Sequence, residues 1–146
     1  MFEDKPNWLQ ALKEQLGEGK VSFDKERLRE FSHDQTEDIS NLPEVVVRPV
    51  TTEDVSIVLR IANKFGIPVT PAAARTGLSG GSIPIFGGIS LSMEGLSKII
   101  EIDESNSQAT VEPGVINQVF HEACKDKGLF YPPDPSSWGS STLGGN

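Results

Sequence analysis

A short strand, a helix and a second short strand follow one another in the first half of the chain. Val45 to Val47 is an apolar run typical of a buried strand. The helical pattern that follows has Thr51 as its N-cap and ends at Gly66, a residue that accepts the left-handed conformation. Ile67 to Thr70 gives the second strand. This order predicts a βαβ unit with two parallel strands and a right-handed crossover.

The second strand leads into a loop of small residues, Pro71 to Gly81. Open α/β sheets bind ligands at the carboxyl ends of parallel strands, where this loop begins. Inward-facing N–H groups in such a loop form an anion-binding nest. The loop also holds hydroxyl groups, a cation and glycines that can take positive φ: Thr76, Ser79, Arg75, Gly77, Gly80 and Gly81. A cradle for phosphate and an ordinary glycine-rich surface loop both remain open as interpretations.

Two common nucleotide-binding motifs are absent from the sequence. The loop lacks G-x-x-x-x-G-K-[ST], which excludes a P-loop, and it lacks the G-x-G-x-x-G of ordinary dinucleotide-binding folds. The net charge of −8, from 13 basic and 21 acidic residues, argues against a nucleic-acid partner. An anionic ligand would therefore be bound by local backbone dipoles and a few placed side chains, against the mean field of the molecule.

The single cysteine, Cys124, excludes an internal disulfide and favours a reducing compartment. The charged N-terminus lacks the apolar core of a signal peptide, and no apolar run is long enough to span a membrane. We therefore expect a cytoplasmic protein. Because the two histidines, His33 and His121, belong to no cluster of ligands, we expect no metal site. We expect Cys124 in the core and both histidines in solvent.

Apolar spacing and end signals predict three further helices: Asn7 to Leu16, about Asp24 to Phe31, and about Asn117 to Lys127. Their apolar sides hold Leu9, Leu12, Leu16, Leu28, Phe31, Val119, Phe120, Ala123 and Cys124. Ile89 to Met93 alternates apolar and polar residues, and a hairpin-type turn joins Ile99–Ile102 to Ala109–Glu112. These three segments predict a half-exposed antiparallel sheet in the second half of the chain.

A second loop of small residues, Pro132 to Asn146, closes the sequence. It is rich in hydroxyl groups and glycine, and its prolines limit its conformational freedom. A domain seldom ends within a glycine turn that has no following element to pack against it. We therefore expect the sequence to be the front part of a longer protein.

Five segments follow one another at plausible spacing from the first of these loops to the end of the second: Thr76–Gly81, Ile102–Asp103, Thr110–Gly114, Gly128–Ser137 and Thr142–Asn146. Together they resemble the FAD-linked oxidase family, in the branch that contains glycolate oxidase and the FAD-dependent D-lactate dehydrogenases. The resemblance implies an α+β, PCMH-type FAD-binding domain of the vanillyl-alcohol-oxidase kind over residues 43–146. Its lobes would be a small parallel βαβ lobe at about 43–70 and an incomplete, mainly antiparallel lobe with flanking helices at about 71–146. Residues 1–42 resemble the helical lead-in of the same proteins.

The resemblance also implies which residues bind FAD. The loop from Pro71 to Gly77 would wrap the diphosphate, and Ser136 to Thr142 with the following Gly-Gly-Asn would line the cofactor further along. The residues implied are Pro71, Ala72, Ala73, Ala74, Arg75, Thr76, Gly77, Leu78, Ser79, Gly114, Pro135, Ser136, Ser137, Thr142, Gly144, Gly145 and Asn146. No catalytic residue is implied, because those of relatives lie beyond the position of Asn146.

The sequence departs from the family at Ala72 to Arg75, where relatives carry Arg-Gly-Gly-Gly or something close. If one of these positions needs positive φ, its side chain costs about 1 kcal/mol. We expect Arg75 to restore the missing charge from another position. Relatives that link flavin covalently place a histidine where this chain has Leu78, so we expect any FAD to be non-covalent.

The resemblance implies the FAD-binding part of an oxidoreductase that acts on a small-molecule 2-hydroxy acid of the glycolate or D-lactate type. Hydride would pass to flavin N5, and the 146 residues alone would have no turnover. The alternative is a non-catalytic α/β module that binds no flavin and self-associates through an exposed sheet edge. The sequence Pro-Pro-Asp-Pro-Ser-Ser at residues 132–137 argues against a flavin domain that reduces a nucleotide-sugar enol ether.

Overall fold

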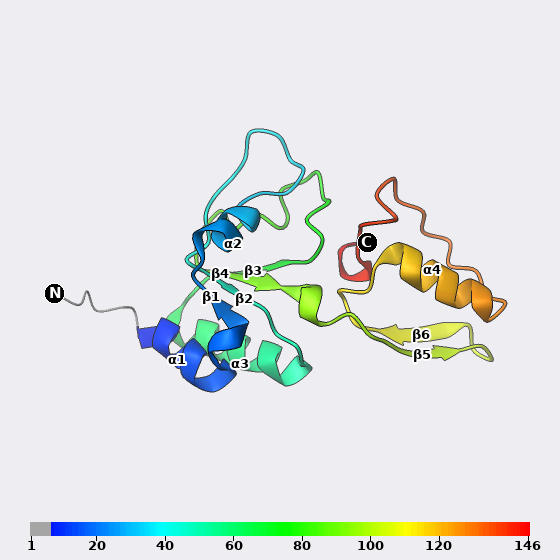
Figure 1. Cartoon of the computed structure of the whole chain (residues 1–146), viewed down its shortest axis with the longest axis horizontal. Helices are drawn as coiled ribbons and strands as arrows, with labels where there is room; N and C mark the ends of the chain where they lie inside the picture. The colour runs from blue at the N-terminus through cyan, green and yellow to red at the C-terminus, as the bar shows by residue number, and fades with distance from the viewer. Residues whose placement is uncertain (1–6) are drawn as a thin grey trace.

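The computed structural model describes residues 7–146 and shows two parts that lie end to end (Figure 1). The first part is built on a four-stranded sheet and the second on a hairpin and one helix. The elements are α1 (Asn7–Leu16), β1 (Val21–Ser22), α2 (Lys25–Glu30), β2 (Val45–Val47), α3 (Thr52–Phe65), β3 (Val69–Ala72), β4 (Ile89–Ser92), β5 (Ile99–Asp103), β6 (Gln108–Val111) and α4 (Asn117–Asp126). None of these described helices is long and apolar enough to cross a membrane.

The sheet of the first part has the strand order β1-β2-β4-β3. β1 is antiparallel to β2, whereas β2, β4 and β3 run parallel. The prediction that the strands on either side of α3 are parallel is confirmed, although β4 lies between them. β3 spans Val69–Ala72 rather than the predicted Ile67 to Thr70. Pro71 and Ala72, which we expected in the loop, therefore belong to the end of the strand.

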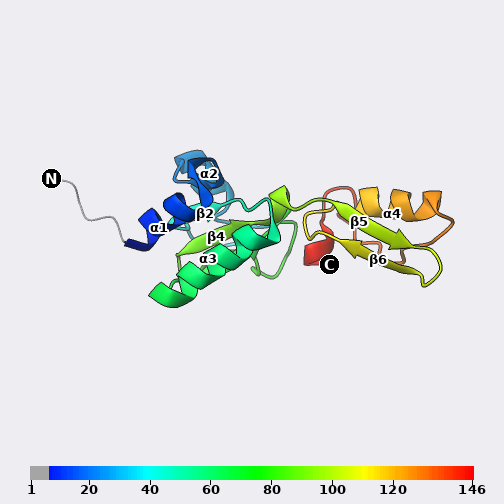
Figure 2. The same cartoon turned by 90° about the horizontal axis from the view of Figure 1, so that it is seen from below.

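Helices cover both faces of this sheet (Figure 2). α1 and α3 pack on the face that carries Val45 and Leu91. On the other face the chain leaves α2 at Phe31, whose ring is fully buried against Val46 and Ala72. The sheet is therefore the central layer of three.

Local signals mark the ends of α2 and α3, and the predicted N-cap Thr51 and the terminal Gly66 of α3 are confirmed. Asp24 caps α2, because its carboxylate accepts hydrogen bonds from two backbone N–H groups of the first turn. Thr51 and Asp54 form a reciprocal capping box at the start of α3, and Gly66 ends that helix with φ 65°. All three features depend on residues a few positions apart, which is why spacing alone predicts them.

β4 corrects the sequence prediction. We expected Ile89 to Met93 in a half-exposed antiparallel sheet, but β4 pairs in parallel with both β2 and β3, and all of its residues are buried. Its alternating pattern has another cause. The two apolar residues of the strand join the core with α1 and α3, whereas Ser90 stands in register with Val46 on the α2 face.

Residues 73–88, here named the crossover loop, connect β3 to its parallel neighbour β4. Such a connection must return along the whole sheet, and a helix usually makes it. Here a segment without helix or strand makes it on the α2 face. The Gly80 N–H donates to Thr36 Oγ1 (2.7 Å), and Asn41 Nδ2 donates to the Pro84 carbonyl (2.8 Å). The segment after α2, residues 31–44, therefore lies against the crossover loop.

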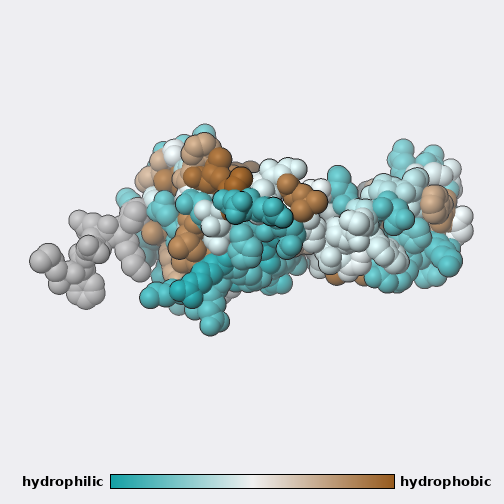
Figure 3. Space-filling model, turned by 90° about the horizontal axis from the view of Figure 1, so that it is seen from above, coloured by the Kyte–Doolittle hydropathy of each residue, from teal (hydrophilic) through white to brown (hydrophobic). Residues whose placement is uncertain are grey.

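These two segments also carry most of the exposed large apolar side chains of the first part. Figure 3 shows apolar surface gathered over the α2 side of the first part, whereas the second part is mostly polar in this view. In these two segments the residues that expose large apolar side chains are Ile39, Leu42, Leu78, Ile85 and Phe86. The two segments are therefore joined by polar contacts and keep several of their apolar side chains in solvent.

The second part contains the predicted antiparallel hairpin, β5 with β6. α4 packs on it through Phe120 and Cys124, and Cys124 is buried as expected. Two expectations for α4 are wrong: Val119 is 49% exposed, and His121 is half-buried with Nδ1 3.3 Å from the Tyr131 carbonyl oxygen. Because a hairpin of two strands is narrow, it covers a thin stripe of the helix.

Candidate functional site

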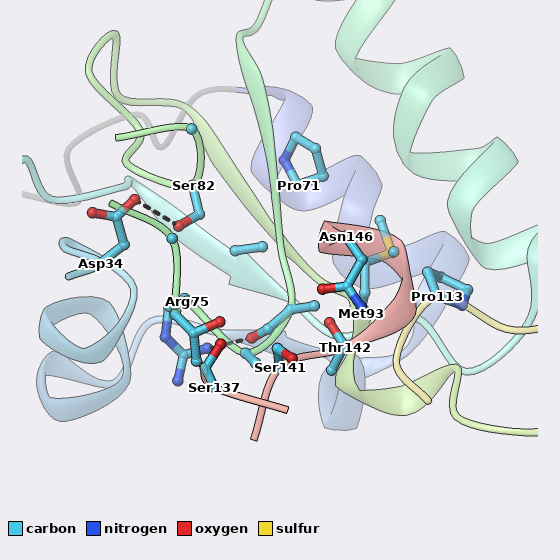
Figure 4. Close-up of a pocket in the computed structure, with 18 of the residues that line it drawn as sticks. Asp34, Pro71, Arg75, Ser82, Met93, Pro113, Ser137, Ser141, Thr142 and Asn146 are labelled. Carbon is cyan, nitrogen blue, oxygen red and sulfur yellow. Dashed lines mark hydrogen bonds between the residues drawn. The ribbon is translucent and has the colours of Figure 1, made fainter. Parts of the chain in front are cut away.

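A cleft of about 540 Å³ opens between the two parts of the molecule. The end of β3 and the crossover loop line one side, and residues 132–146, here named the C-terminal loop, line the other (Figure 4). Met93 and Pro113, at the junction of the two parts, also line it. Asp34 and Ser82 lie where the crossover loop meets the segment after α2.

The cleft brings together most of the residues that the resemblance implies. These are Pro71, Ala72, Ala73, Ala74, Arg75, Thr76, Gly77, Ser79, Pro135, Ser137, Thr142, Gly144, Gly145 and Asn146. Leu78, Gly114 and Ser136 do not line it. Leu78 is 77% exposed, and Gly114 is buried in the junction, where its N–H donates to the Leu96 carbonyl (2.7 Å). The two loops of small residues thus face one another although they are far apart in the sequence.

Two residues between Pro71 and Gly81 have positive φ, Arg75 (55°) and Gly80 (73°). Gly80 adopts this conformation without steric cost. Arg75 carries a side chain, so the left-handed conformation costs about 1 kcal/mol there. The departure from the family at residues 72–75 therefore strains one position, and the three alanines keep ordinary φ.

The side chain of Arg75 makes contacts that offset this strain. Its Cζ lies 4.1 Å from the centroid of the Phe31 ring. Nη2 donates to Glu30 Oε1 (2.6 Å), and Nη1 donates to Glu94 Oε1 (3.1 Å) and to the Ala73 carbonyl (3.0 Å). We expected Arg75 to bring a charge to the site, but two carboxylates already balance that charge.

Arg27 of α2 binds the same two carboxylates. It donates to Glu30 Oε2 (2.6 Å) and to Glu94 Oε2 (2.5 Å), and its Cζ lies 4.5 Å from the Phe31 ring centroid. Burial raises the pKa of Glu94, but hydrogen bonds from Arg27 and Arg75 outweigh it, so the pKa lies below its ordinary value. These five residues, here named the arginine cluster, are neutral as a group.

Asp34 is a cleft residue that the sequence analysis missed. It is 6% exposed, and its carboxylate accepts hydrogen bonds from the Thr36 N–H (2.8 Å) and from Ser82 Oγ (3.3 Å). Burial raises the pKa of Asp34, but hydrogen bonds from Thr36 and Ser82 bring it below its ordinary value, so the carboxylate is ionised at neutral pH. The Asp-x-Thr spacing is typical of a local Asx turn and could have indicated this residue.

The C-terminal loop approaches the junction closely. The Gly144 N–H donates to the Pro113 carbonyl (2.9 Å), and a Cβ on Gly144 would lie 2.5 Å from Pro113 Cβ. Ser141 also lines the cleft and is 4% exposed, yet its Oγ has no hydrogen-bond partner within residues 7–146. A buried polar group without a partner costs about 1–3 kcal/mol.

The lining of the cleft suits an anion better than acid–base chemistry. Its charged side chains, within the part of the chain that the structure describes, are Asp34 and Arg75. Asp34 already accepts hydrogen bonds from Thr36 and Ser82, and Arg75 is ion-paired with two carboxylates. Backbone N–H groups and the hydroxyls of Thr76, Ser79 and Ser137 remain along the walls. Groups of this kind bind phosphate oxygens.

A sequence profile of a family described as the FAD binding domain matches residues 43–146. The chain belongs to this family. Its fold is accordingly an α+β, PCMH-type FAD-binding domain, in which a mixed sheet is followed by a small antiparallel sheet. The cleft described above therefore lies within an FAD-binding domain.

The relatives of this FAD-binding domain include two hydroxy-acid enzymes. The chain is 43% identical over 116 residues to glycolate oxidase subunit GlcD of Bacillus subtilis, a match that covers 80% of this chain and 25% of that one. It is 35% identical over 142 residues to D-lactate dehydrogenase of Anaerostipes hadrus, a match that covers 97% of this chain and 30% of that one. The solved 4-ethylphenol oxidase from Gulosibacter chungangensis matches with a TM-score of 0.80 and 31% identity, over 92% of this chain and 27% of that one. The chain thus spans between a quarter and a third of the length of these relatives.

Proposed function

We propose that this chain is the FAD-binding part of a flavin-dependent oxidoreductase that acts on a 2-hydroxy acid. The observation that carries the proposal is the cleft, where two loops of small residues face one another. The substrate class is supported by the relatives named for glycolate and D-lactate, which are both 2-hydroxy acids.

The cleft fits a cofactor that contains a diphosphate. We assign the diphosphate to the loop from Pro71 to Gly77, where N–H groups and the Thr76 hydroxyl are available. Residues 135–146 would line the cofactor further along. There the unpartnered Ser141 Oγ can donate to it, and Gly144 lets the chain pass close to Pro113.

Bound FAD would supply the hydride acceptor for oxidation at the α-carbon of the substrate. The residues of this chain would bind the cofactor and orient it. No histidine, lysine or cysteine lines the cleft within the described residues. The groups that bind the hydroxy acid and accept its proton would therefore come from elsewhere in the working enzyme.

We propose that FAD binds without a covalent bond to this chain. Leu78 presents an alkyl side chain to solvent. Cys124 is buried in the core of the second part, and burial raises the pKa of its thiol, which disfavours the nucleophilic thiolate. The flavin should therefore be released intact when the protein is denatured.

Titration of the purified protein with FAD, followed by flavin fluorescence and visible absorption, tests the proposal. We expect a saturable complex that releases free FAD on acid denaturation. With the full-length protein under anaerobic conditions, glycolate or D-lactate should bleach the flavin bands. A protein that binds no FAD would refute the proposal and favour a non-catalytic module that acts by association.

A further inference from the structure

We propose that the segment from Arg27 to Thr36, which precedes the matched region of the family, is a working part of the cofactor site. It holds the crossover loop in its binding shape at two points, the arginine cluster and the residues Asp34 to Thr36. The proposal rests on the proposed function for the identity of the ligand, but the contacts themselves belong to the protein alone.

The arginine cluster joins three segments of the chain. Glu30 and Phe31 come from α2 and its end, Arg75 from the crossover loop, and Glu94 from the junction between the two parts. Glu94 directly follows Met93, which lines the cleft. Because the side chain of Arg75 is 15% exposed, water competes little for its hydrogen bonds. The cluster therefore fixes the first turn of the loop against α2 and against the junction between the two parts.

The second point of attachment lies further along the loop. The Gln35 N–H donates to the Gly77 carbonyl (3.0 Å), and the Gly80 N–H donates to Thr36 Oγ1 (2.7 Å). Ser82 Oγ donates to the buried carboxylate of Asp34 (3.3 Å). Three consecutive residues, Asp34 to Thr36, thus bind the middle of the crossover loop.

These contacts matter for binding because the crossover loop has no helix or strand to hold it. A loop of glycines and other small residues populates many conformations unless contacts select one. The apparent affinity for a ligand falls in proportion to the fraction of molecules in the binding conformation. The segment from Arg27 to Thr36 raises that fraction before the cofactor arrives.

Hydrogen exchange of the backbone amides of residues 73–82, measured without flavin, tests the attachment directly. Glu30→Ala removes a partner at the arginine cluster, and Thr36→Val removes the acceptor at the second point. Each variant should raise the exchange rate of the loop amides and the FAD dissociation constant, both by about tenfold. The exchange rates of the amides in β2 and β4 should not rise to the same extent. Arg75→Lys keeps the charge but not the forked geometry, and should have an intermediate effect.

Glu53→Ala is the matched control, since it removes an exposed carboxylate of α3 that is 3.4 Å from Arg60. Loop exchange and FAD affinity equal to this control in both variants would overturn the proposal. An equal rise of exchange in β2 and β4 would also overturn it, because it would show general loss of stability. If the unaltered protein binds no FAD, the proposed function fails, and the exchange data alone decide on the attachment.

Discussion

Gly144 and Gly145 are adjacent in the C-terminal loop but differ in their surroundings. A Cβ on Gly144 would lie 2.5 Å from Pro113 Cβ, whereas a Cβ on Gly145 would meet nothing within 4 Å. Gly144→Ala should therefore lower the free energy of unfolding by about 1–3 kcal/mol through overpacking. Gly145→Ala is the control and should leave it almost unchanged. Urea denaturation measures both, and equal effects would contradict the close approach at Gly144.

Ser141→Ala should change stability and affinity in opposite directions. The Ser141 hydroxyl is buried without a partner within the described residues, so its removal should leave the cofactor-free protein as stable or more stable. FAD should bind about fivefold more weakly, because one hydrogen bond contributes about 1 kcal/mol. Ser140→Ala, at an exposed neighbour, serves as control. A clear loss of stability in the cofactor-free protein would show that the hydroxyl is paired inside the fold.

From the sequence, a side chain within residues 72–75 was expected to cost energy only if its position needed positive φ, and nothing in the sequence showed that Arg75 is such a position. The φ of one loop residue depends on the path of the whole loop, which is set by the pairing of β3 with β4. Asp34 was missed for a related reason. Its local turn is visible in the sequence, but its contact with Ser82 joins residues far apart in the chain.

Among the elements, α3 begins with a buried carboxylate that has several partners. Asp54 accepts hydrogen bonds from Lys20 Nζ (2.7 Å), from the Val50 N–H (2.9 Å) and from the Thr51 N–H (3.1 Å). Burial raises the pKa of Asp54, but its hydrogen bonds from Lys20 and Val50 bring it below its ordinary 3.8. A carboxylate whose pKa is lower in the folded state stabilises the fold above its unfolded pKa, and this is lost as pH falls through the folded pKa.

Asp54→Asn should lower the free energy of unfolding at pH 7 by about 1–3 kcal/mol, because it removes the charge from a bonded carboxylate. The difference from the unaltered protein should shrink as pH falls below about 4, where Asp54 of the unfolded chain becomes protonated, and should be lost as pH falls through the lower pKa of folded Asp54. Urea denaturation across this pH range measures the effect. Glu53→Gln, on the exposed side of the same helix turn, should show little change at any pH. A difference that persists undiminished at low pH would exclude the ionised carboxylate as its source.

The elements that the sequence predicted well are those with local signals. α3 has a capping box and a terminal glycine, and β5 and β6 are joined by a tight turn. β4 has no local signal that separates a buried parallel strand from a half-exposed antiparallel one. Its alternation of Ile89 and Leu91 with two serines is decided by the layers on each side of the sheet, which the sequence does not display.

For the whole molecule, the cleft lies between the two parts, so one ligand would contact both. FAD at 100 times its dissociation constant should raise the free energy of unfolding by about 2.7 kcal/mol. Hydrogen exchange should slow in both β2 and α4, and thermal unfolding should shift upward. Riboflavin, which lacks the diphosphate, is the control and should give a much smaller shift. Protection confined to one part would contradict a cofactor that bridges the cleft.

β4 is the last strand of its sheet along the chain, yet it occupies a place between β2 and β3. During synthesis, β2 and β3 therefore have no shared neighbour until residues 89–92 emerge. When β4 pairs with β2 and β3, the crossover loop closes over the α2 face, because this loop connects β3 to β4. Such non-local closure is slow and is completed late. A chain interrupted before β4 would have neither a complete sheet nor a closed crossover loop. An incomplete first part of this kind would not bind the cofactor.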